Sequence, residues 1–314
     1  MFNIKRIDDK EDNVSKLIFT NETAVAEAVL YKYPDYKTRT VICCSSQSGC
    51  PVGCRFCGAG DSFVRSLTAE EIVFQVDHAV SLTDCDPDEM GRLQIMFMSM
   101  GEPLLNQKHL CEAIRILHEK YPKAWLLIST SAPDVPIDDI IEVSKEISTV
   151  GLQFSIHEST DEKRDLLIPF KKKMDLEKIS FTGEKWFHET GRKPFFNYCA
   201  HDKNSSPEDV NRLWILFDPN IWCATVSVIC ERNDGMPTSN EFQRKLATDF
   251  GDKLVDVGYD TRVFDPAGQD TIGGGCGQLW FVQDWMDKNP ELTKPSVGRD
   301  LPTVHVPTEE LESV

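Results

Sequence analysis

The spacing of three cysteines between positions 50 and 57 constrains this chain more than any other feature. Cys50, Cys54 and Cys57 form a Cys-x-x-x-Cys-x-x-Cys pattern in a loop that contains Gly and Pro and follows the apolar run 40–43. Three thiolates on one short loop can hold three irons of a 4Fe–4S cube, which leaves one iron open to a small molecule. Phe56 would shield such a cluster from water. The loop therefore predicts a metal site that takes part in chemistry.

A structural zinc site is the alternative for these thiols. Tetrahedral zinc takes four protein ligands, usually as two separated pairs. The sequence contains no second Cys-x-x-Cys pair and no His-x-x-x-His pair. The pattern therefore favours the iron–sulfur cluster, and it resembles the hallmark of the radical S-adenosylmethionine (SAM) superfamily.

Composition sets limits on the class of protein. With 314 residues, of which 40% are hydrophobic, the chain can bury a large core. The charged N-terminus MFNIKRIDDKEDN does not resemble a signal peptide, and no apolar run is long enough to cross a bilayer. We therefore expect a cytoplasmic protein without membrane contact, in which clustered cysteines indicate metal binding or catalysis. The net charge of −17 has the wrong sign for a protein that binds nucleic acid mainly through phosphates.

From residue 40 onward, apolar runs of strand length alternate with segments of helical periodicity. Strands are expected at 41–44, 93–98, 125–129, 151–155, 195–199 and 224–229. Helices are expected at 68–82, 107–120, 137–147, 174–190, 206–217 and 238–250. Six βα units in succession imply a parallel sheet with right-handed crossovers, as an open doubly wound sheet or as an incomplete barrel.

Polar residues follow three of the expected strands, where parallel sheets place their chemistry. These are Met100-Gly101-Glu102-Pro103, Ser129-Thr130-Ser131 and Ser155-Ile156-His157. A carboxylate and small hydroxyls would suit the ammonium group and ribose diol of SAM. Each segment alone would be ordinary helix capping. Their joint placement after the cysteine loop predicts a binding site.

Five segments, in matching order, resemble the RlmN/Cfr family of RNA methyl synthases. They are CCSSQSGCPVGCRFCGAG at 43–60, MSMGEPLLN at 98–106, ISTS at 128–131, SIHESTDEKRDLLIP at 155–169 and GGGCGQL at 273–279. The resemblance implies an α/β fold, a partial (β/α)6 radical-SAM barrel over 40–283. An N-terminal extension with a β-hairpin (1–39) would precede it, and a flexible acidic C-terminal tail (284–314) would follow. Only 42 residues precede Cys43, so we expect a compact member without the family's N-terminal accessory domain.

The hairpin is expected from strands at 16–19 and 24–30, and the first dozen residues are expected to be flexible. Residues 259 to 283 are expected to add a strand or two and the loop around Cys276.

The resemblance also implies roles for particular residues. Cys50, Cys54 and Cys57 would bind the cluster. The implied contacts to SAM are Gly101, Glu102, Ser129, Ser155, Ile156, His157 and Asn233.

The family methylates an adenine ring carbon of ribosomal RNA, and some members also act on transfer RNA. Such a carbon is too electron-poor to attack a sulfonium methyl group, so a carrier is needed. By resemblance, Cys276 takes a methyl group from one SAM, and a 5′-deoxyadenosyl radical from a second SAM activates it for addition to the ring. Cys43 then releases the RNA by forming a disulfide with Cys276, and Glu27 is the implied proton acceptor.

By sequence alone, plainer interpretations of these residues stay open. Cys276 lies in a glycine turn, Cys43 could be a small buried hydrophobe, and Glu27 is only a carboxylate on a strand expected to be exposed. The remaining cysteines are interpreted as packing residues: Cys44, Cys85, Cys111, Cys199, Cys223 and Cys230. Basic residues at 163, 164 and 171–173 form one group that could offset the acidic charge.

Three functions remain possible from the sequence. The first is a methyl synthase that modifies adenine in ribosomal or transfer RNA. It would be a monomer that takes electrons from an external donor such as flavodoxin or ferredoxin. The second applies the same chemistry to a smaller nucleic acid, a nucleotide or a peptide. The third is a non-catalytic metal-binding protein.

Overall fold

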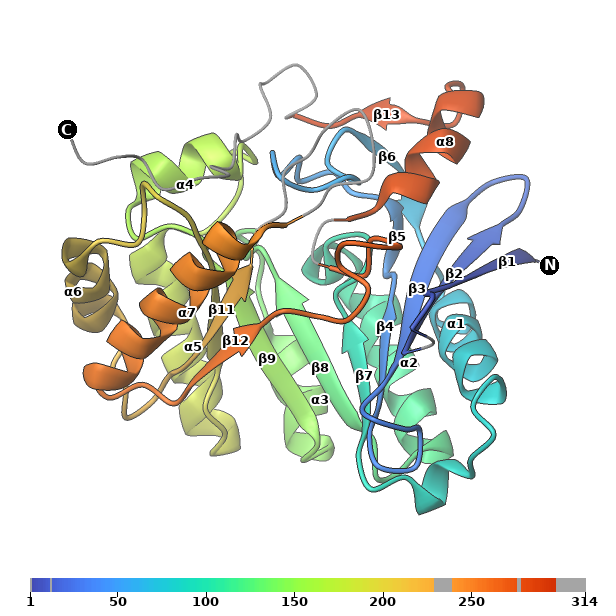
Figure 1. The fold of residues 1–314 in the computed structure, drawn as a ribbon, viewed down its shortest axis with the longest axis horizontal. Coiled ribbons are helices and arrows are strands. Elements are labelled where there is room, and N and C mark those ends of the chain that lie inside the picture. Colours follow the sequence, from blue (N-terminus) through green and yellow to red (C-terminus); the bar gives the residue numbers. More distant parts are fainter. Residues whose placement is uncertain (1, 12, 229–238, 276–277, 298–314) are drawn as a thin grey trace.

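The protein is built on a ten-stranded sheet that curves into a partial barrel (Figure 1). The structure is a computed structural model and describes residues 2–11, 13–228, 239–275 and 278–297. The parallel strands are β4 (Thr40–Cys44), β7 (Leu93–Phe97), β8 (Trp125–Thr130), β9 (Val150–Ser155), β10 (Phe195–Ala200), β11 (Cys223–Val228) and β12 (Thr261–Phe264). The strand order ends at β12, so the barrel stays open on one side. The expected partial barrel is confirmed.

Helices cover the outer face of the sheet (Figure 1). They are α1 (Ala69–Ser81), α2 (Gln107–Lys120), α3 (Asp138–Glu146), α5 (Leu176–Thr190), α6 (Pro207–Leu216) and α7 (Glu241–Asp256). All six were expected, and α7 extends further than expected. Every residue of β4 and β7 is buried, as strands covered on both faces require. Capping boxes at Thr68 and Ser206 begin α1 and α6.

The N-terminal extension continues the barrel sheet. The hairpin is confirmed as β2 (Val14–Thr20) and β3 (Val25–Lys32), and β3 pairs antiparallel with β4. The expectation of a flexible start was wrong for β1 (Asn3–Asp8), which pairs antiparallel with β2. The order of β1 comes from backbone hydrogen bonds to the edge of β2. A weakly apolar segment has no sequence pattern of its own that predicts such pairing.

The expectation of a flexible tail from residue 284 was wrong for its first part. Helix α8 (Trp280–Lys288) crosses that boundary, and β13 (Lys294–Pro295) pairs antiparallel with β6 (Ser62–Ser66). Val282 and Met286, one helical turn apart, are buried, so an acidic segment is held by a narrow apolar stripe.

Short elements that the sequence analysis did not predict complete the fold: β5 (Gln47–Gly49), the 3-10 helices η1 (Pro87–Glu89) and η2 (Pro103–Asn106), and α4 (Asp161–Leu167). Across the described ranges, no helix combines the length and the apolar character that a membrane crossing requires.

Candidate active site

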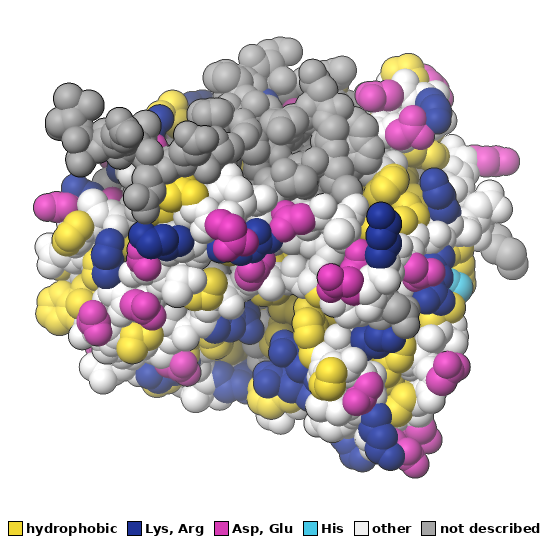
Figure 2. Space-filling model, viewed as in Figure 1, with side chains coloured by type: hydrophobic (Ala, Val, Ile, Leu, Met, Phe, Trp, Pro, Cys, Tyr) yellow, Lys and Arg dark blue, Asp and Glu magenta, His cyan; other side chains and the backbone are white. Residues whose placement is uncertain are grey.

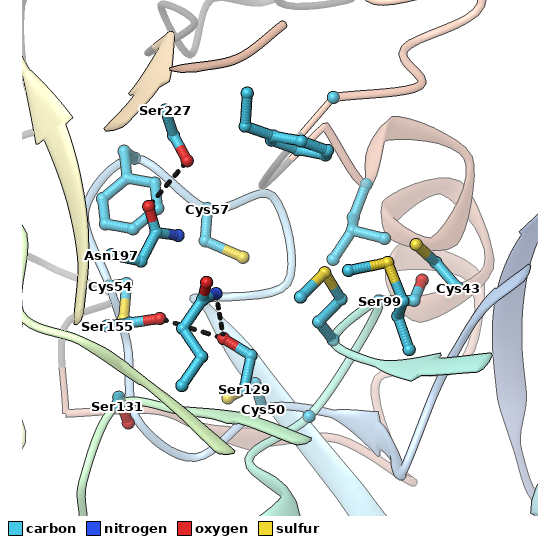
Figure 3. A pocket seen from close by; sticks show the side chains of 18 of the residues that line it. Cys43, Cys50, Cys54, Cys57, Ser99, Ser129, Ser131, Ser155, Asn197 and Ser227 are labelled. Atoms are coloured by element: carbon cyan, nitrogen blue, oxygen red, sulfur yellow. Dashed lines mark hydrogen bonds between the residues drawn. The ribbon is translucent and has the colours of Figure 1, made fainter. Parts of the chain in front are cut away.

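A cavity at the carboxyl ends of the barrel strands brings together residues from distant parts of the chain (Figure 3). Counted out to its open mouth, it encloses about 1130 Å³. Its walls carry the three loop cysteines and polar residues from β8, β9, β10 and β11. The expected alignment of the cysteine loop with the strand ends is therefore present.

Consecutive turns shape the cysteine loop. The amide of Cys57 donates to the carbonyl of Cys54 (3.1 Å), and the amide of Gly60 donates to the carbonyl of Cys57 (3.0 Å). A Cβ atom at Gly60 would lie 2.5 Å from the Cys54 carbonyl oxygen, so only glycine fits there. The turns hold Cys50, Cys54 and Cys57 on the wall of one cavity.

The three thiols lie within one another's electrostatic field. Burial raises the pKa of Cys50 and of Cys54, and neighbouring thiolates raise both further. Arg164 opposes this rise at Cys54. Buried thiolates of this kind require a nearby cation, which a bound metal cluster supplies. The donor set thus fits a 4Fe–4S cluster.

The alternative of zinc fits less well. Within the described part of the chain, no three His, Cys, Asp or Glu side chains converge as ligands of one metal ion. A tetrahedral zinc requires that convergence. Three thiolates that each bind a separate iron of a cube do not.

An apolar layer lies beside the cysteines. Phe56 is buried and meets the ring of His157 edge-on, with ring centroids 5.0 Å apart. The same apolar cluster includes Ile168 and Cys199 and contacts the loop cysteines. Cys199 therefore packs beside the predicted ligands, as a residue predicted to serve packing should.

Gly101 and Glu102 line the cavity after β7. Gly101 has φ +100°, and a Cβ there would lie 2.6 Å from the Cβ of Gln47. The buried Glu102 carboxylate accepts from the amide of Leu104 (2.9 Å), the amide and hydroxyl of Ser131 (2.7 Å each) and the hydroxyl of Thr130 (2.5 Å). Burial raises its pKa, while these bonds act in the opposite direction. The carboxylate is thus a fixed group that joins β7 to the end of β8.

A polar network crosses the floor of the cavity. The hydroxyls of Ser129 and Ser155 lie 3.3 Å apart, and the amide of Gln153 donates to Ser129 (3.0 Å). The hydroxyl of Ser227 donates to Asn197 (2.7 Å). The two serines of β8 and β9 were predicted from the sequence, whereas Gln153, Asn197 and Ser227 were not. Thr225 and Ser227 alternate with apolar residues inside β11, and this alternation was a signal that could have revealed Ser227.

Of the three remaining residues expected to contact SAM, His157 lines the cavity, Ile156 does not, and Asn233 lies outside the described residues. His157 lines the cavity with φ +61°, and burial lowers its pKa to about 3, so its ring is neutral at physiological pH. Its buried Nδ1 has no hydrogen-bond partner among the residues that the structure describes. Ile156 is fully buried, and its amide donates to the carbonyl of Asn197 (3.0 Å).

Glu27 is buried and lines the cavity, so the expectation of an exposed strand was wrong. Helix α8 packs against β3, which removes that strand from solvent. The Glu27 carboxylate lies 3.1 Å from Lys16 Nζ, and Lys16 also donates to the carbonyl of Gln278 (2.5 Å). Burial raises the pKa of Glu27, and Lys16 moderates the rise. One buried cation thus links this carboxylate to the glycine loop.

The expected thiol pair is described in part. Cys43 is buried on β4 and lines the cavity, on the opposite side of the view from Cys54 (Figure 3). Cys276 lies outside the described residues. Its neighbours Gly274 and Gly275 line the same cavity, and the hydroxyl of Tyr31 donates to the carbonyl of Gly274.

Comparisons with known proteins match this chain to radical SAM proteins and to RNA methyltransferases. The Radical SAM superfamily profile matches residues 44–183. The chain is 34% identical over 274 residues to a protein of Thermotoga sp. (strain RQ2) named "Probable dual-specificity RNA methyltransferase RlmN", covering 85% of this chain and 76% of that protein. It is 31% identical over 286 residues to "Ribosomal RNA large subunit methyltransferase N" of Nitrosopumilus maritimus (strain SCM1), covering 87% and 78%.

Among solved structures, the fold is similar to that of a radical SAM methyltransferase from Sphaerobacter thermophilus. The TM-score is 0.74 at 27% sequence identity, over 88% of this chain and 80% of that chain. Similarity therefore extends well beyond the segment that the superfamily profile matches.

Proposed function

Because the chain belongs to the RlmN family of radical SAM RNA methyltransferases, we propose that it adds a methyl group to an adenine ring carbon of ribosomal or transfer RNA. The observation that carries this proposal is the shared cavity. Thiols for a 4Fe–4S cluster, a second thiol at Cys43 and the glycines that precede Cys276 all line it. Cluster chemistry and cysteine chemistry would meet there.

We propose that Cys50, Cys54 and Cys57 hold the cluster. Gly101, Glu102, Ser129, Ser155, Ile156, His157 and Asn233 are the proposed contacts to SAM. When bound, the cluster and SAM supply one-electron reduction and a carbon radical, for which an external electron donor is required. The protein's own part is to fix these groups, and the four hydrogen bonds on Glu102 and the neutral ring of His157 support that role.

The two cysteines outside the cluster are proposed to carry and release the methyl carbon. Cys276 bears the methyl group whose carbon becomes bonded to the adenine. The methyl group would lose one hydrogen atom to the deoxyadenosyl radical before its carbon bonds to the ring. The ring hydrogen then leaves as a proton, which Glu27 accepts, and an electron, which the bound cluster would take back. The Cys43 thiolate attacks the Cys276 sulfur, an S–S bond forms, the S–C bond to the product breaks, and the released carbon takes up a proton to become the methyl group. Burial raises the pKa of Glu27, which makes its carboxylate a stronger base than an exposed one and suits it to accept a proton.

The direct test is anaerobic incubation of the reconstituted protein with methyl-labelled SAM, a reductant and candidate RNAs, followed by nucleoside analysis. We expect label on a ring carbon of adenosine. Label on a nucleotide or peptide instead would move the substrate to another class. A reconstituted cluster that cleaves SAM without labelling any RNA would overturn the proposal.

A second test separates the two thiols. The Cys43→Ala variant should accumulate a covalent protein–RNA adduct, because nothing remains to release Cys276. Cys44→Ala is the matched control, since Cys44 is the next residue of β4 and is fully buried in the main core. Free RNA product from Cys43→Ala at the wild-type rate would contradict the assigned role.

A further inference from the structure

Three arginines converge at the opposite end of the barrel from the cysteines. Arg39 directly precedes β4, Arg92 directly precedes β7, and Arg262 lies in β12. All three therefore lie near the amino ends of the parallel strands. A strand of five residues spans about 16 Å, so Arg39 and Arg92 are separated from the strand ends that carry Cys43 and Ser129. Arg262 lies between the two ends, because it also lines the cysteine cavity and donates to Thr225 (2.9 Å) and to Gln153 (3.4 Å).

No carboxylate pairs with any of these arginines in the part of the chain that the structure describes. The Arg39 guanidinium lies 5.1 Å from the centre of the Tyr33 ring, and its Nε donates to the side-chain oxygen of Gln94 (3.0 Å). The Arg262 guanidinium lies 5.2 Å from the centre of the Phe195 ring. Unpaired arginines are unexpected in a chain with 51 acidic and 34 basic residues.

The three charges also act on one another. Burial and the neighbouring Arg92 lower the pKa of Arg39, and burial, Arg39 and Arg92 lower the pKa of Arg262. Asp260 partly opposes the effect at Arg262 without forming an ion pair. Keeping like charges together costs stability, and a bound anion would offset that cost.

A second cavity joins Arg92 and Arg262 to the first. It is lined by Arg92, Arg262 and the half-exposed Trp125, and encloses about 990 Å³ counted to its open mouth. Both cavities share Met96, Met98, Gln153 and Arg262 as lining residues. Lys and Arg side chains gather around the hollow in the lower middle of the face in Figure 2. The hollow of the open barrel thus extends from the thiols to the arginines.

We propose that Arg39, Arg92 and Arg262 bind the phosphodiester backbone of the RNA whose adenine enters the cysteine cavity. This inference rests on the proposed function and adds a location to it. Guanidinium groups bind phosphate oxygens through charge-assisted hydrogen bonds. The exposed Trp125 and the ring of Phe195 offer stacking surfaces for unpaired bases flanking the target adenine.

This site differs from the basic group expected at residues 163–173. Arg164 is fully buried and donates to the carbonyls of Met174 and Ser131 (2.7 Å each), and Lys173 pairs with Asp165. That segment therefore offers RNA less positive charge than its sequence implies. The arginine cluster is the stronger candidate because its charges are not neutralised.

The test compares the double variant R39Q/R92Q with the wild type in binding a short fluorescein-labelled single-stranded RNA by anisotropy. Without these two guanidinium groups, binding should weaken by about tenfold for each arginine replaced. The slope of log K against log salt, between about 50 and 200 mM, should fall by about 0.7 for each phosphate that the variant no longer neutralises. The variant R39K/R92K keeps the charge and should retain most of the slope.

The matched control is K178Q/K185Q, which makes the same change in net charge on the outer helix α5, where both lysines are exposed and paired. Its RNA affinity should equal that of the wild type. Cluster absorbance and SAM binding should be unchanged in R39Q/R92Q, and its melting temperature should not fall, because like charges have been removed. Unchanged RNA affinity and slope in that folded variant would overturn this inference alone. Wild-type protein that binds RNA through the arginines and never methylates it would overturn the proposed function instead.

Discussion

The two ends of the barrel are built on different principles. At the carboxyl ends of the strands, the proposed iron ligands Cys50, Cys54 and Cys57 are partly buried and are neighbours in sequence. At the amino ends, the arginines are spread from Arg39 to Arg262, and Arg92 and Arg262 line an open hollow. Chemistry at a cluster requires fixed, dehydrated groups, which a local loop can specify. Attraction of a polyanion requires only a field, which residues from any strand start can create.

This contrast implies that the two ends can be disabled separately. A change at the thiol end should remove chemistry and leave RNA affinity intact. A change at the arginine end should do the reverse.

The largest effect is expected from Cys54→Ala, which removes one of three proposed iron ligands. Cluster absorbance near 400 nm and RNA methylation should both be lost, while RNA affinity and its salt dependence stay at wild-type values. Cys199→Ala is the control, because Cys199 is buried in the apolar group that contacts the loop cysteines. This variant should keep the iron–sulfur cluster. A Cys54→Ala protein that still binds the iron–sulfur cluster after reconstitution would contradict the ligand assignment.

The next effect concerns stability at the thiol end. Lys16→Met removes the cation beside the buried Glu27 carboxylate and should lower the free energy of unfolding by about 3–5 kcal/mol near neutral pH. Burial already raises the pKa of Glu27 above 4.5, so the folded state binds this proton more tightly than the unfolded state. The stability from this group is complete below about pH 4.5 and is lost as the pH rises through the folded pKa.

Without Lys16 that pKa rises further, so the loss in Lys16→Met should be greater at pH 8 than at pH 5. Urea unfolding at both values measures it. The double variant K16M/E27Q carries no titrating carboxyl at this position and should lose the added pH dependence. An equal loss at both pH values would show that Lys16 acts only through packing.

Much of the fold could be predicted from the sequence, because buried parallel strands are continuous apolar runs. Capping boxes mark the first residues of helices such as α1 and α6. Strand β1 and helix α8 could not be predicted in this way. The ordering of β1 depends on a partner strand, and that of α8 on a buried stripe of few residues.

The site shows the same division. The cysteine loop and the turns after β7, β8 and β9 could be predicted because each is a short polar segment with its own spacing. Asn197 and Ser227 were missed, since they lie inside strands and their meaning comes from strand order. The arginine cluster was missed for the same reason. Pairing of β4 with β7 sets Arg39 beside Arg92, and curvature of the sheet brings Arg262 of β12 to them.

A smaller effect is expected at Glu102. In Glu102, one carboxylate oxygen accepts from Ser131 and the other accepts from Thr130 and Leu104. Glu102→Gln replaces one of these oxygens with an amide group, which donates. Unfolding free energy should fall by about 2–3 kcal/mol through the unsatisfied donors. Binding of SAM, measured by calorimetry, should weaken at least about tenfold, the size of one charged hydrogen bond. Glu112→Gln on the exposed face of α2 is the control. A loss of RNA affinity equal to the loss of SAM affinity would break the separation of the two ends.

The smallest effect sharpens the distinction within the arginine end. Arg192 also lines the second cavity, yet its guanidinium donates to the carbonyls of Val150 (2.9 Å) and Ser144 (2.5 Å). Its donors are therefore used by the protein itself. Arg192→Gln should lower the unfolding free energy by about 1–2 kcal/mol and leave the salt dependence of RNA binding unchanged. A change in slope as large as that of R39Q/R92Q would mean that charge at this end acts collectively, and that hydrogen-bond partners do not separate structural arginines from those that bind RNA.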